Sequence, residues 1–177
     1  TTYTVTVTNT NGCTDTEVTT ITVNPLPTAA ISIAETSGTT NNDGIICAGA
    51  TTTLTASGGT TYLWSTTATT AGITVTPANT TTYTVTVSDA NGCTDTEVTT
   101  ITVNPLPTAA ISIAETSGTT NNDGILCAGA TSTLTASGGT SYIWSTAATT
   151  AGISVTPTGT TTYTVTVTNT NGCTDTE

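Results

Sequence analysis

The sequence predicts an all-β protein made of small two-layered β-sandwiches that follow one another end to end. Three observations lead to this fold class: a composition dominated by Thr, a sequence that repeats itself, and short segments in which apolar and polar residues alternate. The composition and the alternation favour strands over helices, and the repeat indicates one small domain per copy.

The composition is the first observation. About one residue in three is Thr, and Lys, Arg, His, Met and Phe are absent. Because Thr is β-branched, its side chain is restricted in a helix and packs well on the pleated surface of a sheet. Val and Ile add to the same preference, so we expect almost no helix.

The second observation is a repeat with a period of 80 residues, of which the chain holds about 2.2 copies. Tyr3, Tyr83 and Tyr163 occupy equivalent places, and the cysteines keep the same interval. Residues 1–80 differ from residues 81–160 at eleven positions, nearly all of them exchanges between residues of similar size. This period is too long for a solenoid repeat of one hairpin or one helix pair, but it suits one small sandwich per copy.

The third observation is a series of short strand-like segments within one copy. The expected strands lie at residues 28–33, 45–47, 51–56, 60–65, 73–76, 82–87 and 93–103. Residues 82–87 alternate most clearly between Thr and an apolar residue, and the pair Asn91-Gly92 supplies a tight turn to the last strand. Seven short strands with Trp64 on one of the middle ones describe an Ig-like sandwich.

The linker Asn24–Pro27 marks a boundary between copies, because its two prolines stiffen the chain and interrupt a sheet. We therefore expect residues 1–26 to be the closing hairpin of a preceding repeat. Residues 27–106 form a complete repeat, and residues 107–177 form a repeat that lacks most of its last strand. On this interpretation the chain is a window from a longer polypeptide, with its export signal upstream.

The predicted core of each sandwich is small. Its aromatic residues are Trp64 and Tyr83 in one copy and Trp144 and Tyr163 in the next. Its aliphatic residues in the first copy are Ile31, Ile33, Leu54, Ile73, Val75, Val85, Val87, Ile101 and Val103. Burying an aliphatic side chain stabilises by about 1.5 to 3 kcal/mol, whereas ordering a residue costs about 1 to 2 kcal/mol. Because the margin is narrow, disulfides would contribute substantially.

The charge excludes several classes of partner. The chain has eleven carboxylates and no basic side chain, which gives a net charge of -11. Nucleic acid is excluded because Lys and Arg supply most of the affinity of nucleic-acid-binding proteins. An anionic membrane surface would repel the chain, and the longest apolar runs are too short to span a bilayer, so membrane insertion is not expected.

Catalysis has little chemistry to use in this sequence. His and Lys are absent, and the cysteines are expected to be oxidised. The remaining candidates are carboxylate pairs such as Asp95 and Glu97, which lie on the same side of a strand. A solvated strand face explains such a pair better than acid–base catalysis does, so we expect no catalytic residue and no enzyme.

Several motifs resemble those of a known family. They are ICAG at residues 46–49, LTASGG at 54–59, YLWS at 62–65 and TYTVTV at 82–87, closing on NGC at 91–93. Together they resemble the PKD-like and Ig-like tandem repeats of large Bacteroidota cell-surface adhesins, including gliding-motility-type and other type IX-secreted proteins. The resemblance covers the whole chain. It implies an extracellular Ig-like sandwich at the bacterial cell surface, acting as a stalk, spacer or adhesive array.

The five cysteines, Cys13, Cys47, Cys93, Cys127 and Cys173, indicate disulfides in such a secreted repeat protein. Cys47 precedes the strand at 51–56 and Cys93 follows the strand at 82–87. Because these strands run in the same direction in an Ig-like sandwich, the two cysteines lie about 25 Å apart, whereas bridged Cα atoms lie within about 7 Å. The end that carries Cys47 faces the next domain and its Cys173, so the topology favours an inter-domain Cys47–Cys173 bond.

An alternative keeps the disulfides within each domain, as Cys47–Cys93 and Cys127–Cys173. The family pattern of two cysteines per copy supports it, and an irregular segment before residue 51 would let Cys47 double back. With the inter-domain bond instead, Cys13, Cys93 and Cys127 would find their partners outside residues 1–177.

Six residues are candidate Ca²⁺ ligands at the same junction: Asn41, Asn42, Asp43, Asn169, Asn171 and Asp175. Carboxylate and amide oxygens are the ligands that this ion prefers. An ordinary polar turn is the simpler interpretation, because Asn and Asp tolerate left-handed backbone and bond their own main chain. No other cofactor is expected.

Three functions follow from these observations. We favour a non-catalytic extracellular structural or adhesive array, whose partners are other copies of the repeat in the same chain. The second is a segment or subunit of an extracellular filament, in which sheet edges pair between neighbouring chains. The third is a glycan-binding module, which would need exposed aromatic side chains.

Overall fold

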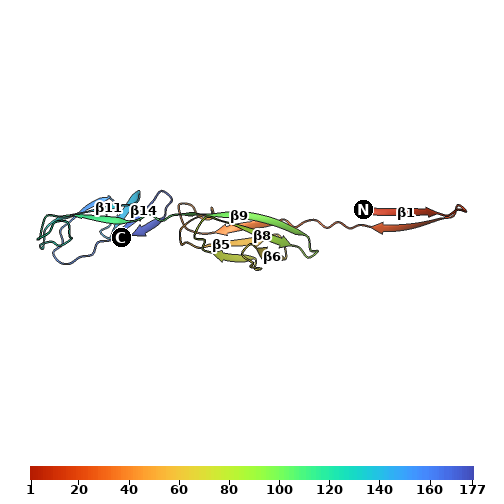
Figure 1. Ribbon diagram of the computed structural model, residues 1–177, viewed down its shortest axis with the longest axis horizontal. Coiled ribbons are helices and arrows are strands. Elements are labelled where there is room, and N and C mark those ends of the chain that lie inside the picture. The colour runs from red at the N-terminus through yellow and green to blue at the C-terminus, as the bar shows by residue number, and fades with distance from the viewer.

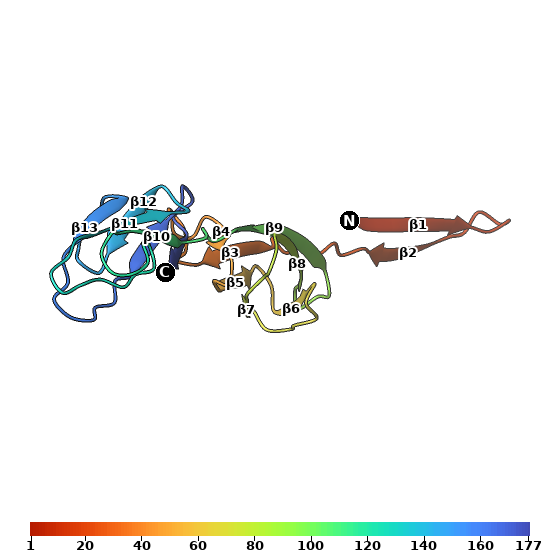
Figure 2. The ribbon, with the colours of Figure 1, turned by 60° about the vertical axis from the view of Figure 1, so that its left-hand side comes forward.

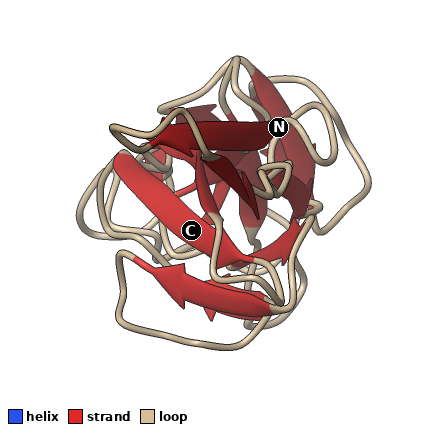
Figure 3. Cartoon of the chain, turned by 90° about the vertical axis from the view of Figure 1, so that its right-hand side faces the viewer, coloured by secondary structure: helices blue, strands red, loops and turns tan.

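The computed structural model describes all 177 residues and confirms the all-β class, with 46% of the residues in strands and no helix. Figure 3, coloured by secondary structure, shows only strands and loops. No helix long and apolar enough to cross a membrane is present. The chain is elongated, with a hairpin at one end followed by two strand-rich bodies in a row (Figure 1).

The first of these bodies, residues 29–104, is called the central unit here. One sheet has the order β3-β5-β7, from β3 (Ala30–Ala34), β5 (Thr52–Ser57) and β7 (Gly72–Val75). The other has the order β4-β9-β8-β6, from β4 (Ile45–Cys47), β9 (Thr94–Asn104), β8 (Thr81–Ser88) and β6 (Thr61–Trp64). All neighbours are antiparallel except β4 and β9, which run parallel. The observed strands lie close to the expected ones.

One core lies between the two sheets of the central unit. Trp64 and Tyr83 are both buried in it, together with Val85 and Val87 from the same alternating strand. The indole Nε1 of Trp64 donates a hydrogen bond of 3.0 Å to the carbonyl of Thr70, so its only polar atom is satisfied. Alternation of Thr with apolar residues therefore places one face of β8 in the core, as its sequence pattern predicts.

The second body, residues 109–177, is called the C-terminal unit. Its sheets have the orders β10-β11-β13 and β12-β14-β15. The strands are β10 (Ala110–Ala114), β11 (Ser132–Ser137), β13 (Gly152–Val155), β12 (Ser141–Trp144), β14 (Val165–Thr168) and β15 (Thr174–Thr176). Trp144 is buried as expected, but Tyr163 is only partly buried against the core. The reason is local: no strand lies beside residues 161–164, whereas β9 covers the equivalent residues of β8.

The N-terminal hairpin consists of β1 (Thr2–Thr8) and β2 (Thr14–Thr20), paired in antiparallel register. Tyr3, Val5 and Val7 are 58%, 56% and 62% exposed, although their equivalents in β8 are buried. Figure 2 shows the hairpin projecting from the central unit with no second sheet against it. Its apolar face is therefore open to solvent.

Candidate functional site

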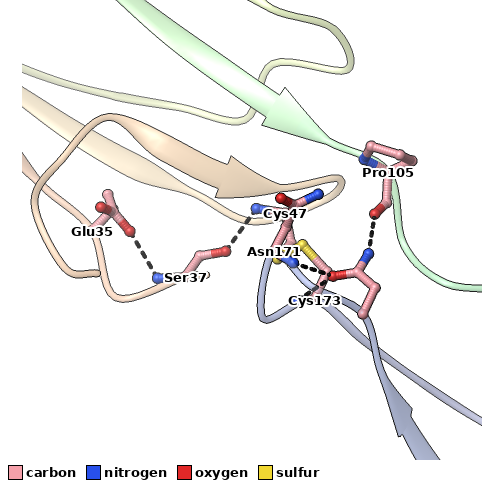
Figure 4. Close-up of a disulfide and its surroundings, with 7 residues drawn as sticks. Glu35, Ser37, Cys47, Pro105, Asn171 and Cys173 are labelled. Atoms are coloured by element: carbon pink, nitrogen blue, oxygen red, sulfur yellow. Dashed lines mark hydrogen bonds between the residues drawn. A yellow bond between two sulfur atoms is a disulfide. The ribbon is translucent and has the colours of Figure 1, made fainter. Parts of the chain in front are cut away.

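A disulfide joins the central unit to the C-terminal unit (Figure 4). The sulfur atoms of Cys47 and Cys173 lie 2.01 Å apart and the Cα atoms 5.5 Å apart, and the sequence separation of the two residues is 126. Cys47 ends β4, and Cys173 lies in the turn between β14 and β15. This is the inter-domain pair that the sandwich topology favoured.

The alternative intradomain pairs, Cys47–Cys93 and Cys127–Cys173, are not formed. The parallel pairing of β4 with β9 gives the reason. Cys47 lies opposite Asn104, at one end of β9, while Cys93 immediately precedes the other end. At a rise of about 3.3 Å per residue the two cysteines are separated by roughly 30 Å or more, which no disulfide can bridge.

The turn that carries Cys173 is held in place by hydrogen bonds of its own. Asn169 Oδ1 accepts hydrogen bonds from the backbone N–H groups of Asn171 and Cys173, both at 3.0 Å. The N–H of Asn169 donates in return to the carbonyl of Cys173 at 3.0 Å. These local bonds are typical of Asn in turns and orient the cysteine toward the other unit.

Two further contacts cross the junction beside the disulfide. Asn169 Nδ2 donates a hydrogen bond of 3.0 Å to the carbonyl of Pro105 (Figure 4). Gly172, at φ +75°, packs so closely that an added Cβ would meet the backbone carbonyl carbon of Gly38 at 2.8 Å and Thr39 Cγ2 at 3.0 Å. Only Gly fits this position, because a side chain would push the two turns apart.

A buried carboxylate organises the loop that leads to Cys47. Glu35 is only 4% exposed, and its two oxygens accept hydrogen bonds from the N–H groups of Ser37 at 2.8 Å and Asp43 at 3.1 Å. Ser37 Oγ in turn accepts a bond of 2.7 Å from the N–H of Cys47. Sequence reasoning missed Glu35, because a Glu within a polar loop carries no pattern that distinguishes it from a solvated one.

Four of the six candidate Ca²⁺ ligands use a side-chain oxygen to accept a backbone N–H. Asn42 accepts from Glu35 at 3.1 Å, Asp43 from Ile45 at 2.8 Å, and Asn169 from the turn described above. Asp175 accepts from Ala109 at 2.9 Å. The loops that carry Asn41 and Asn171 meet at Gly38 and Gly172. No cluster of three or more His, Cys, Asp or Glu side chains that could hold a metal ion is present.

The carboxylate pair Asp95 and Glu97 is divided between two environments. Asp95 Oδ2 accepts a hydrogen bond of 2.9 Å from the N–H of Ala29, which attaches the start of the central unit to β9. This bond, together with one from the N–H of Thr96, lowers the pKa of Asp95 below its ordinary value. Glu97 is exposed. Asp175 holds Ala109 in the same way in the C-terminal unit.

Cys13, Cys93 and Cys127 carry free thiols. Cys13 and Cys127 are exposed, and Cys93 is partly so. Cys13 and Cys93 lie in hairpin turns equivalent to that of Cys173, and Cys127 is the equivalent of Cys47. Each therefore lies at a position equivalent to one of the two cysteines of the disulfide.

The fold and the junction define an all-β protein whose units are joined covalently. Compared with known proteins, the chain matches no family model and no curated sequence. The function must therefore be argued from the junction itself.

Proposed function

We propose that the chain is a non-catalytic array of Ig-like, PKD-like domains of about 80 residues, which serves as a stalk or spacer in a bacterial cell-surface protein. The disulfide between Cys47 and Cys173 carries this proposal, because it attaches one unit to the next instead of closing a loop within one unit. Such a bond restricts the movement of one unit relative to the next, and a stalk requires units in a fixed arrangement.

The two cores support the division into domains at residues 27–106 and 107–177. The core around Trp64 is drawn from residues 29–103, and the core around Trp144 from residues 109–167, with no residue shared between them. The strand registers of the two units agree as well, since Ala30 pairs with Ser57 and Ala110 with Ser137. Each copy therefore has the contacts to fold around its own core.

Stiffness at the junction follows from attachments at several separate points. The disulfide and the close packing of Gly172 on Gly38 connect the two units, and the hydrogen bond from Asn169 to Pro105 attaches the C-terminal unit to the linker between them. The linker between them contains Pro105 and Pro107, which restrict backbone rotation. Because bending would have to break more than one attachment, the pair of units acts as a rod.

An extracellular location fits the chemistry of the chain. Disulfides persist in oxidising compartments and are rare in the cytosol. The net charge of -11 favours solubility, and the lack of Lys and Arg leaves no site for proteases that cleave after basic residues. The resemblance to Bacteroidota surface repeats supports a bacterial cell surface as the location of the proposed stalk.

Immunogold electron microscopy of the native material tests the proposed function. Antibodies raised against the 177-residue chain should label beaded, unbranched stalks on the outside of intact cells. Label confined to the cytoplasm of permeabilised cells would contradict an extracellular role. Label along ordered helical filaments would contradict the stalk and support the second candidate function, a subunit of an extracellular filament.

That second candidate, a subunit of an extracellular filament, is favoured by Leu63 in β6 and Ile143 in β12, which are 54% and 59% exposed on strands at the edges of their sheets. Exposed strand edges and apolar faces are typical sites of pairing between chains. The glycan-binding module gains no such observation, because Trp64 and Trp144 are buried in the cores and are not placed to stack on a sugar ring.

A further inference from the structure

Three Asn-Gly pairs occur in the chain, at residues 11–12, 91–92 and 171–172, and the last of them lies at the junction between the units. In such a pair the side-chain amide of Asn is open to attack by the next backbone nitrogen, because Gly has no side chain that hinders the approach. Asn171 is exposed, and its hydrogen bond to Asn169 uses its backbone N–H and not its side-chain amide. Asn171 is therefore chemically a site for deamidation.

Deamidation of this pair takes place in two steps. The backbone nitrogen of Gly172 forms a bond to Cγ of Asn171, and the side-chain nitrogen leaves as ammonia with the proton of the Gly172 N–H. Water then opens the resulting succinimide ring at one of its two carbonyl carbons. The product is either aspartate or isoaspartate, and in isoaspartate the main chain runs through the former side chain and is longer by one carbon.

The peptide group between Asn171 and Gly172 must rotate before this attack, and the structure restrains it in two ways. Within its own turn, the N–H of Gly172 donates a hydrogen bond of 3.1 Å to the carbonyl of Asn169. Against the central unit, a Cβ added to Gly38 would lie 3.5 Å from the carbonyl oxygen of Asn171, and one added to Gly172 would lie 2.9 Å from the carbonyl oxygen of Gly38. While the disulfide holds the two units together, this peptide group therefore has little room to rotate.

The disulfide is the contact that keeps this restraint in place. Figure 4 shows Asn171 beside the bond between Cys47 and Cys173, and Gly172 is the residue that links Asn171 to Cys173. Without the bond, the contact between Gly38 and Gly172 depends on packing alone, and local opening of the turn becomes easier. The chemistry of Asn171 is thereby coupled to the redox state of the junction.

We propose that the closed junction protects Asn171 from deamidation, and that a junction opened by reduction is lost irreversibly once isoaspartate forms there. The added backbone carbon precedes Gly172, at a place where the packing on Gly38 leaves no space even for a Cβ. The lengthened turn then no longer presents Cys173 to Cys47. This inference goes beyond the proposed function and depends only on the geometry of the junction.

Incubation of the full chain in mildly alkaline buffer tests the protection. Peptides are released by cleavage after Glu, and mass spectrometry follows the conversion of each Asn over time. Asn171 should deamidate about tenfold faster in Cys47→Ser than in the unaltered chain, because the turn is then free to open. Cys13→Ser leaves the junction intact and is the matched control, which should deamidate at the rate of the unaltered chain.

Asn91 serves as an internal control in the same samples. Its turn precedes β9, whereas Cys47 lies opposite Asn104 at the other end of that strand. Opening of the junction should therefore leave the rate at Asn91 unchanged, whereas unfolding of the chain would raise the rates at both sites. Equal rates at Asn171 in Cys47→Ser and Cys13→Ser, or a rise at Asn91 as large as that at Asn171, would overturn the protection.

Reoxidation tests the irreversible step. The unaltered chain is reduced with dithiothreitol, kept for increasing times and reoxidised with glutathione disulfide, and peptide mapping then measures the share of chains with a Cys47–Cys173 bond. This share should fall as isoaspartate accumulates. Asn171→Ser has no side-chain amide and keeps the backbone N–H that Asn169 binds, so it should re-form the bond equally well at all times. A decline of the same size in Asn171→Ser, or full recovery of the bond in chains that carry isoaspartate, would contradict the irreversible step.

Discussion

At the scale of single residues, the carboxylates of this chain take their partners from the backbone. No Lys, Arg or His is present to pair with them, and Glu35 and Asp95 both accept backbone N–H groups. No buried side-chain nitrogen or oxygen is left without a hydrogen bond. A hydrogen bond between a charged group and an N–H is stronger than one between neutral groups. These acidic residues therefore stabilise loops through hydrogen bonds to the backbone and not through ion pairs.

Glu35→Gln should lower the free energy of unfolding of the central unit by about 1 to 3 kcal/mol. The amide keeps one acceptor but turns an NH₂ group toward an N–H that had been bonded to the second oxygen. Urea unfolding followed by the fluorescence of Trp64 measures the change. Glu97→Gln, at an exposed site, is the control and should change the unfolding free energy little. Equal effects of the two changes would contradict the role of Glu35.

Asp95 should make the stability of the central unit depend on pH in the acid range. Hydrogen bonds from Ala29 and Thr96 lower its folded-state pKa, so its contribution is complete above the ordinary carboxyl pKa of about 3.9 and is lost as the pH falls through the lower folded value. Asp95→Asn should therefore reduce the melting temperature at pH 7 and flatten its decline between about pH 5 and pH 2. Asp15→Asn, at the equivalent site of the hairpin, should leave this decline as it is. If the melting temperature of Asp95→Asn declines in acid as that of the unaltered chain does, the hydrogen bond between Ala29 and Asp95 is not the cause of the decline.

Gly139→Ala should destabilise the C-terminal unit by about 1 to 3 kcal/mol. An added Cβ would lie 2.4 Å from Val167 Cγ1 and 2.6 Å from the carbonyl oxygen of Thr168, closer than packed atoms approach. Gly159→Ala, in the same unit, meets nothing within 4 Å and should be nearly neutral. Thermal unfolding followed by the fluorescence of Trp144 compares the two. A neutral Gly139→Ala would show that β14 does not pack there as the structure has it.

At the scale of elements, the same strand sequence is buried or exposed according to what lies against it. Tyr83 in β8 is buried, Tyr163 is partly buried, and Tyr3 in β1 is 58% exposed, although all three follow the same alternating pattern. Alternation predicts the strand and which residues share a face, because both are local properties. It does not predict whether a second sheet covers that face. For this reason the sequence predicts the same burial for Tyr163 as for Tyr83, whereas Tyr163 packs against the core only partly buried.

The two units should unfold separately, with the C-terminal unit less stable. Its core cluster holds seven buried residues against ten in the central unit. Each unit contains one tryptophan, so a Trp144→Phe chain reports on the central unit and a Trp64→Phe chain on the C-terminal unit. In urea, the fluorescence of Trp144 should change at the lower concentration. A single common midpoint would indicate one cooperative body instead of two units.

At the scale of the whole molecule, topology was more predictive than side-chain detail. The direction of the strands places Cys47 and Cys93 at opposite ends of a sandwich, and this suffices to favour a bond from Cys47 to Cys173. The hydrogen bond from Asn169 to Pro105 was not predicted, because it depends on the angle at which the units meet. The close packing of Gly172 was not predicted either, because it also depends on that angle. In addition, the Asn-Gly turn by itself already explains a glycine at this position.

The central claim is that separately folded units are held in a rod by the disulfide between Cys47 and Cys173. Small-angle X-ray scattering of the 177-residue chain tests it most directly. Adding Cys47→Ser should broaden the distribution of interatomic distances, because the junction can then bend, while adding Cys13→Ser should leave the distribution unchanged. Identical scattering from all three chains, or a compact particle in any of them, would contradict the account.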